Sequence, residues 1–477
     1  MCTGIKNIFI ITVVSVFLVT ANEPTVGLIK WVPEKSYPGY TLFPGKHVGA
    51  VMLIDNAGMI INSWEKSTYE PGQSAYLLPD GSLIRCALLK NKYNIGGGEG
   101  GRFEKYSWDG KLLWAFNYAT ENYMSHHDIA VLPNGNILAM CVEKKTIEEC
   151  VEAGFNKSRI RDGYVSVEFL VELKQTGFST YEKVWEWHLW DHLIQDYDTT
   201  KANYGTVVEH PELVDVHGGQ GKRIPAFWNH GNSVDYNAKF DQICLSIRGN
   251  SEFWIIDHST TTKEAAGHTG GTFGKGGDLL YRWGNPESYD RGTRNDRVLY
   301  QQHDAQWIPD GYPGAGNILI YNNGIDRPGT KYSSIEEVEL PCDSKGVFPE
   351  IGAKTAWLPV KPNWTYTAKN PADFYSAEIS GVQRLPNGNT LICEGLKGHF
   401  FEITPQEEIV WSYINPLVSW DTLSQGDDPT DDIDPRGHQH NAVFKIHRYP
   451  LDYPAFKGKT LKPLRPVEKK PWPFSKN

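Results

Sequence analysis

QSAYLLPDGSLI (residues 73–84) is the stretch that decides the fold, because the chain repeats its pattern. It begins with the polar residue Gln73, reaches Pro79 six positions later, and continues through Asp80-Gly81 into a second apolar run. Three more copies keep this frame with its proline, at residues 127–140, 303–320 and 380–392, and two keep it without the proline, at residues 230–247 and 440–449. Alternating apolar residues favour strands, Asn-Gly and Asp-Gly favour tight hairpin turns, and proline ends a strand because it cannot donate to the ladder. The sequence therefore predicts six related β-hairpins.

A second element, a short strand-like run that ends in tryptophan, precedes each hairpin. The six tryptophans are Trp64, Trp114, Trp187, Trp283, Trp364 and Trp411. Because three or four antiparallel strands repeated six times are typical of propeller blades, we predict an all-β, six-bladed β-propeller. The run AVMLID (residues 50–55) is expected to complete the sheet begun near residues 440–449 and so to close the ring. A β-sandwich with coincidental turns is the alternative.

The two ends of the chain differ in composition from the repeats between them. Lys6 precedes the apolar run of residues 8–19, and small residues follow, which predicts a signal peptide over residues 1–21 and a secreted or extracytoplasmic protein. An uncleaved anchor is the alternative, although the run is short for a membrane span. The propeller is predicted over residues 22–454, followed by a basic, proline-rich tail over residues 455–477.

Export has consequences for the cysteines and for glycosylation. Six cysteines remain after the signal peptide, so disulfides are possible, and Cys141 and Cys150 are the closest pair. Buried free thiols are the alternative, because several cysteines lie in apolar strand-like runs. Sequons at Asn156 and Asn363 predict a glycoprotein.

Charge and hydropathy exclude two classes of partner. The formal net charge is −10, and no long basic run occurs before the tail, so nucleic acid is not expected as a partner. No apolar stretch beyond the leader approaches the length of a membrane helix, so no span is expected after cleavage. The pattern leaves the oligomeric state open.

The first polar position of each hairpin predicts a functional site at the propeller axis. Because the innermost strand of each blade follows the central channel, these six positions would form a ring: Gln73, His127, His230, His303, Ser380 and His440. Four of the six are histidine, in a chain that has 15 histidines, which favours a site over structural roles. Several imidazoles around one cavity suit an oxyanion or a metal ion. The donors Arg248, Asn322, Asn323 and Arg327 nearby favour the oxyanion, and with no Cys/His zinc spacing in the chain we expect no cofactor.

Long segments of the chain resemble a known family. WNHGNSVDYN (residues 228–237), QQHDAQWIPDG (301–311), NILIYNNGIDR (317–327) and ISGVQRLPNGNTLICEG (379–395) are similar to the bacterial-type arylsulfotransferases, in the branch without an extra N-terminal domain. The resemblance extends over roughly residues 40–455. It implies a six-bladed propeller that moves a sulfuryl group from an aryl sulfate donor to a phenolic acceptor through a sulfohistidine, without a nucleotide donor.

The resemblance also implies roles for individual residues. His230 and His303 match the histidines that contact the sulfuryl oxygens, and Arg327 matches a channel arginine. The nucleophilic histidine is expected after Arg327, but the next ring position is Ser380, so His440 is the candidate nucleophile. A substrate-binding role is assigned to the remaining set, which is His127, Arg248, Asn323 and Ser380.

Two other functions remain open at this stage. Four axial histidines could hold a non-haem iron, which would make the protein a metal-dependent propeller enzyme. Alternatively, Ser380 in place of a ring histidine could mark a propeller that binds a ligand without catalysis. In every case the expected partner is a small molecule, and for the transferase it is an aryl sulfate and a phenol.

Overall fold

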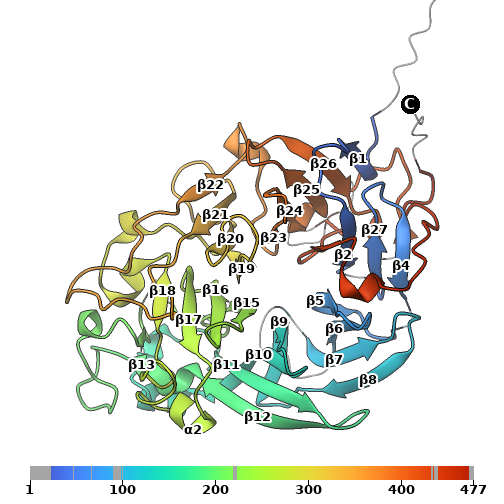
Figure 1. Ribbon diagram of the computed structural model, residues 1–477. Helices are drawn as coiled ribbons and strands as arrows, with labels where there is room; N and C mark the ends of the chain where they lie inside the picture. The colour runs from blue at the N-terminus through green and yellow to red at the C-terminus, as the bar shows by residue number, and fades with distance from the viewer. Residues whose placement is uncertain are drawn as a thin grey trace, which may run out of the picture.

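Six antiparallel sheets stand around one axis in the computed structural model, like blades around a hub (Figure 1). The structure describes residues 23–46, 48–65, 67–89, 98, 100–218, 223–419, 421–430, 433 and 439–471. The predicted signal peptide, residues 1–21, lies outside the described residues. The six-bladed β-propeller predicted from the repeats is confirmed.

The first three blades follow one another along the chain, each from its inner strand to its outer strand. Blade 1 holds β5 (Pro71–Leu77), β6 (Leu83–Leu88), β7 (Gly101–Tyr106) and β8 (Leu112–Asn117). Blade 2 holds β9 (Tyr123–Val131), β10 (Ile137–Thr146), β11 (Tyr164–Gln175) and β12 (Tyr181–His188). Blade 3 holds β15 (Gly231–Asn237), β16 (Gln242–Ile247), β17 (Glu252–Asp257) and β18 (Tyr281–Trp283).

The last three blades include both ends of the described chain. Blade 4 holds β19 (His303–Trp307), β20 (Ile318–Asn322), β21 (Ser334–Val338) and β22 (Trp364–Tyr366). Blade 5 holds β23 (Gly381–Arg384), β24 (Thr390–Glu394), β25 (His399–Ile403) and β26 (Ile409–Ile414), with β1 (Gly27–Trp31) added outside β26. Blade 6 holds β29 (His447–Pro450), β2 (Gly39–Pro44), β3 (Val51–Ile54) and β4 (Ile60–Trp64).

Blade 6 closes the ring by joining the two ends of the chain. Its inner strand β29 comes from the end of the sequence and pairs with β2, so that Leu42 lies opposite His447. Strand β3, which contains Val51–Ile54 of the AVMLID run, is the next strand outward. The predicted closure is therefore present, and β1 strengthens it by pairing with β26 of blade 5.

The hairpin turns form as their sequences dictate. In blade 1 the N–H of Leu78 donates to the carbonyl of Ser82, and the N–H of Gly81 donates back to Leu78. Gly81, Gly135 and Gly388 occupy the same turn position with φ between 84° and 89°, which side-chain-bearing residues rarely adopt. The Pro-Asn/Asp-Gly signal thus marks a turn that needs glycine.

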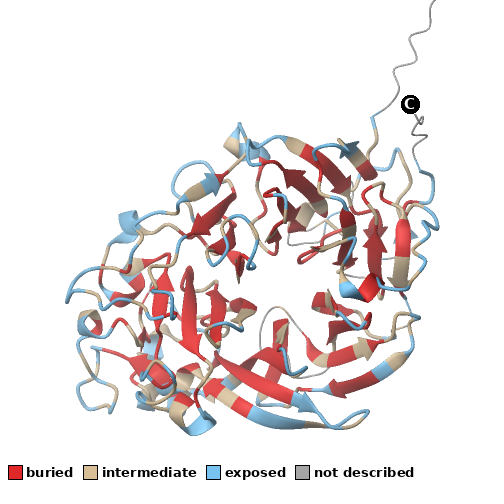
Figure 2. Cartoon of the chain, viewed as in Figure 1, coloured by how far each residue is buried: buried red, intermediate tan, exposed pale blue. Residues whose placement is uncertain are grey.

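Each predicted tryptophan strand is the fourth strand of a blade, on the outer side of the ring. Trp187 and Trp411 are almost fully buried between neighbouring blades. Figure 2 shows the result over the whole molecule: the strands are mainly buried, and exposure concentrates in the outer loops. No helix among the described residues is long and apolar enough to span a membrane.

Insertions lengthen the loops of blades 2 and 3. They contain the short helices α1 (Ile147–Glu152) and α2 (Thr262–Ala265), and the parallel pair β13 (Leu193–Ile194) and β14 (Val214–Asp215). A further short pair, β27 (Leu417–Val418) and β28 (Asp421–Thr422), follows blade 5. The described cysteines are free thiols, and Cys141 and Cys150 do not pair.

Candidate functional site

The inner strands carry a repeated backbone irregularity at or beside the ring positions. His127 and His230 have φ near +47°, and Asp304, just after His303, has φ of 54°. At each of these places the pairing with the second strand slips, which is the signature of a β-bulge. Positive φ costs free energy at residues other than glycine and clusters at functional sites. The bulges bring side chains of different blades into contact.

Three of the four predicted ring histidines meet at the axis. The ring centroids of His127 and His230 are 5.3 Å apart. Phe444, from the segment before β29, contacts both His127 and His303, with centroids 5.8 Å and 6.1 Å away. Phe227 stacks on His230 at 4.4 Å. These five residues, from blades 2, 3, 4 and 6 and the segments that lead into them, are called the histidine cluster below.

A buried hydrogen-bonded chain holds His127. Glu168 of β11 accepts hydrogen bonds from Gly231 N–H (2.6 Å) and from His126 Nε2 (2.9 Å). A carboxylate only accepts, so His126 carries its proton on Nε2 and its Nδ1 lone pair faces His127 Nδ1 at 2.7 Å. His127 therefore donates through Nδ1, and its Nε2 holds the lone pair. We call Glu168, His126 and His127 the relay.

Gly98 covers the His127 ring. The backbone N–H of His127 donates to the Gly98 carbonyl at 2.8 Å. A Cβ at position 98 would lie 1.9 Å from His127 Cε1, and the φ of Gly98 is +69°. Only glycine fits here, because both the space and the backbone conformation exclude a side chain.

Asn323 sets the tautomer of His303 in the same manner. The two amide hydrogens of Asn323 donate to the carbonyls of Ser376 (2.8 Å) and Ile379 (2.9 Å). Its Oδ1 must therefore face His303 Nδ1, which donates to it at 2.7 Å. The lone pair of neutral His303 is again on Nε2.

Burial keeps the cluster imidazoles uncharged. It lowers the pKa of His127 and His230 well below the usual value for histidine, with nearby histidines and Arg248 adding to the effect. For His303, burial and then the positive charge of Arg248 lower the pKa to about 3. At neutral pH the site thus has three neutral imidazoles beside one guanidinium. Arg248 itself is mostly buried, with Glu378 3.9 Å away.

A buried ionic layer lies next to the cluster along the inner strands. Lys445 Nζ is 2.7 Å from Asp128 Oδ2 and 3.2 Å from Asp304 Oδ1. The three residues come from blades 2, 4 and 6, and each directly follows a cluster residue in the sequence. We call them the ionic layer. It links alternate blades across the axis.

His440 is placed differently from the prediction. Its Nδ1 lies 3.4 Å from Ser419 Oγ in a partly exposed setting, and Phe444 occupies the cluster position of blade 6. Phe444 corresponds to His127 and His303 at the cluster, and Lys445 corresponds to the aspartates that follow those histidines. The sixth copy of the repeat therefore starts four residues later than predicted. This copy lacks the proline that fixes the frame of the others.

The other predicted residues divide between the site and its surroundings. Arg327 packs between Tyr300 and Tyr332, with centroids 5.0 Å and 4.1 Å from its guanidinium carbon, and donates to Ser334 Oγ at 2.8 Å. The guanidinium that acts on the cluster is Arg248. Ser380 is buried, and its Oγ accepts from Gly395 N–H at 3.2 Å.

Sequence reasoning missed three residues that matter here: His126, Glu168 and Lys445. The His126-His127 pair was visible as a doublet, but successive residues of a strand normally point to opposite faces, and only the bulge brings both rings together. Glu168 and Lys445 carried no local signal. Gln73, the ring position of blade 1, is half-buried on β5.

A family model covers most of the chain. The family model described as Arylsulfotransferase (ASST) matches residues 29–422. A search of the curated proteins finds no match.

Solved structures with a similar shape are distant in sequence. A protein of unknown function from Bacteroides caccae is 11% identical, with a TM-score of 0.44, over 86% of this chain and 98% of that chain. Virginiamycin B lyase from Staphylococcus aureus is 10% identical, with a TM-score of 0.35, over 84% of this chain and 94% of that chain. Likeness at this level says nothing about activity.

Proposed function

Because the chain belongs to the arylsulfotransferase family, we propose that it transfers a sulfuryl group from an aryl sulfate to a phenol through a histidine of the cluster. The observation that carries this proposal is the meeting of three neutral imidazoles from three blades beside the buried cation Arg248. Neutral imidazole is a nucleophile and a base, and a guanidinium binds a tetrahedral oxyanion through its fork of donors.

The charge of the site suits this reaction. Sulfuryl transfer resembles phosphoryl transfer, in which a loose transition state leaves the protein mainly to position groups and to offset charge on the oxygens. Arg248 supplies that positive charge in a water-poor site, where it acts more strongly than in water. The flat rings of Phe227 and Phe444 border the imidazoles and suit an aryl group.

We assign the nucleophile to His127, because the relay supports it. Its Nε2 lone pair forms the N–S bond while the S–O bond to the aryl group breaks, and the phenolate leaves with the bonding electrons. The ring then carries a positive charge and a proton on Nδ1. His126 accepts a hydrogen bond from that proton, and Glu168 stabilises His126 through its Nε2–H.

His303 is suited to the second half of the reaction. Its Nδ1–H is committed to Asn323, so its neutral ring can only accept at Nε2. It would take the proton of the acceptor phenol while the phenol oxygen attacks sulfur and the N–S bond breaks, returning the lone pair to His127 Nε2. The proton on His303 is then passed to water. This assignment makes His303 a base rather than a donor to the sulfuryl oxygens.

The two alternative functions lose part of their support. The four-histidine set that the sequence suggested for an iron site included His440, which lies beside Ser419. A propeller that only binds its ligand was suggested by Ser380; the N–H of this serine donates to the carbonyl of Phe444, and its Oγ accepts from Gly395 N–H, so it has a structural role beside the cluster. Phe444 holds the cluster position of blade 6.

The experiment is intact-protein mass after incubation with an aryl sulfate whose phenolate is coloured. We expect release of the phenolate and a gain of one sulfuryl group per chain, mapped by peptide analysis to His127. His127→Ala should lose both signals. Glu168→Gln tests the positioning role of the relay: its labelling rate should fall by at least tenfold while its affinity for the aryl sulfate stays close to that of the wild type.

His440→Ala is the matched control and should be labelled like the wild type. Labelling that persists in His127→Ala and disappears in His440→Ala would overturn the assignment of the nucleophile. Absence of phenolate release by the folded wild-type protein across a panel of aryl sulfates would overturn the proposed function itself.

A further inference from the structure

A second group of histidines lies far from the axis, in the insertions of blades 2 and 3. His192 follows β12, and His268 and Asp278 lie at the two ends of the glycine-rich loop that precedes β18. One nitrogen from each histidine and one oxygen from Asp278 all lie within 4.8 Å of one another. His192 is fully buried, Asp278 is nearly so, and the side chain of His268 is 60% exposed.

The hydrogen bonds of His192 leave its Nδ1 facing a carboxylate. Its Nε2 lies 2.9 Å from the carbonyl of Ala265, and a carbonyl only accepts, so Nε2 carries a proton. Its Nδ1 faces Asp278 Oδ1 at 2.8 Å. The two atoms at this distance share a cation, which is either a proton or a metal ion.

We propose that His192, His268 and Asp278 bind a divalent transition-metal ion. Both histidines approach the same carboxylate oxygen through Nδ1 at 2.8 Å. With metal–ligand bonds of about 2.1 Å, that spacing corresponds to an angle of roughly 85° at the metal, close to the right angle of a 2-His-1-carboxylate triad. The exposed ring of His268 can rotate to complete the set.

The surroundings of His192 match those of a metal ligand. Metal-binding histidines usually donate their second nitrogen to a carbonyl or a carboxylate, as His192 does to Ala265. The ring stacks on Trp187, with centroids 5.6 Å apart and planes 7° from parallel, which fixes its orientation. Gly277 lies close to the same ring, since a Cβ at position 277 would lie 2.6 Å from His192 Nε2.

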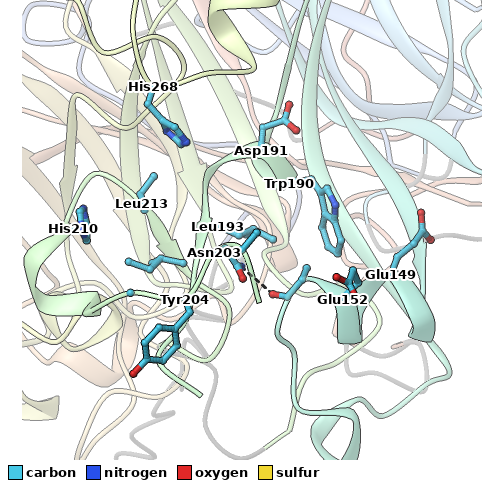
Figure 3. Close-up of a pocket in the computed structure, with 14 residues that line it drawn as sticks. Glu149, Glu152, Trp190, Asp191, Leu193, Asn203, Tyr204, His210, Leu213 and His268 are labelled. Carbon is cyan, nitrogen blue, oxygen red and sulfur yellow. Dashed lines mark hydrogen bonds between the residues drawn. The ribbon is translucent and has the colours of Figure 1, made fainter. Parts of the chain in front are cut away.

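A cavity of about 580 Å³ adjoins the group (Figure 3). His268 lies at its edge, and Leu193, next to His192 in sequence, also lines it. A triad supplies three ligands, so an ion here keeps positions for water or for a small molecule from the cavity. The ion would also fasten two insertions to each other. This inference does not depend on the proposed sulfuryl transfer.

The test is Co²⁺ binding to chelator-treated, full-length protein, followed by visible absorption, with Zn²⁺ and thermal unfolding as a second measurement. We expect one Co²⁺ per chain in the wild type and a rise in Tm with Zn²⁺. His268→Ala is exposed enough to leave the fold intact and should weaken Co²⁺ binding by more than tenfold. Asp278→Asn keeps a hydrogen-bond acceptor but loses the charge, and it should weaken binding similarly.

Two controls separate this site from others. His210 lines the same cavity and is paired with Glu212 at 2.9 Å, so His210→Ala should bind Co²⁺ like the wild type. His127→Ala should also bind normally, because the axial cluster is a different place. Wild-type affinity no tighter than that of His268→Ala would overturn the proposal and leave the group as a histidine–carboxylate hydrogen-bond set.

Discussion

At the scale of residues, the protein keeps several imidazoles neutral by burying them. Burial disfavours the charged form of histidine, and a nearby cation such as Arg248 adds to the penalty. The benefit at the cluster is a nucleophile and a base that hold lone pairs at neutral pH. The cost is a folding stability that falls in acid, because these histidines bind protons in the unfolded chain at pH values where the folded chain does not.

His447 on β29 allows this cost to be measured away from the cluster. Burial, and then the charge of Lys445, lower its pKa to about 3. The unfolded ring protonates near pH 6.5 and the folded ring does not, so stability falls as pH drops from 6.5 toward 3, by about 1.4 kcal/mol per unit. His447→Leu removes this dependence.

We therefore expect the stability advantage of the wild type over His447→Leu to shrink by about 2 kcal/mol between pH 7 and pH 5. Urea unfolding at the two pH values measures it. Lost packing in the variant does not depend on pH, so only the change in the difference is diagnostic. An unchanged difference would show that His447 is already protonated in the folded state or that the variant perturbs another titration.

At the scale of elements, the inner strands combine a bulge with a hairpin. The bulge turns one residue toward the cluster, and the next residue joins the ionic layer, as in His127-Asp128 and His303-Asp304. Buried charges are expensive unless paired, so the ionic layer ties blade 6 to blades 2 and 4 and fixes the register of β29.

Lys445→Met tests the ionic layer. The change leaves Asp128 and Asp304 buried without a cation, which is expected to cost about 3–5 kcal/mol of the free energy of unfolding. Lys35→Met is the matched control, because the Lys35–Glu408 pair is roughly half exposed and solvent screening leaves it a small contribution to stability. Denaturant unfolding compares the two.

A triple variant, Lys445→Met with Asp128→Asn and Asp304→Asn, should recover part of the loss, because no charge then remains buried in the layer. Equal costs for Lys445→Met and Lys35→Met would contradict the idea that the layer holds the blades.

At the scale of the whole molecule, strand pairing between the two ends of the chain closes the ring, and no disulfide among the described cysteines does so. Strand β29 from one end and β2 from the other complete one sheet, and β1 covers the neighbouring blade. The ring is therefore held by strands from both ends of the chain. Among the described cysteines none is bonded, although the predicted export would permit disulfides.

The state of the thiols can be counted on the intact protein. Cys86, Cys141, Cys150, Cys244 and Cys393 are buried, and Cys342 is half-buried. We expect a thiol reagent to label at most Cys342 quickly in the native protein, and all six after unfolding without reductant. Burial raises the pKa of these thiols, for example that of Cys86 to about 12, which slows native labelling further. Fewer than six thiols in the unfolded protein would reveal a disulfide.

The sequence by itself determined the blade. Six hairpin copies, each with a tryptophan strand before it, define a unit that cannot bury its faces alone, so the units must stack into a ring. Local chemistry also placed His127, His230 and His303 at one repeat phase. The degenerate sixth copy misled the prediction for His440, because without its proline the frame could slide by four residues.

Only the tertiary structure decided which side chains act together. Glu168 reaches His126 across β11 and β9, and Asn323 fixes His303, through contacts between residues far apart in the chain. The convergence of His192 with Asp278 depends on two insertions folding against each other. The periodicity of the sequence indicates how each segment folds, but it does not indicate which distant segment that segment contacts. Packing and hydrogen bonding between blades leave no repeat in the sequence.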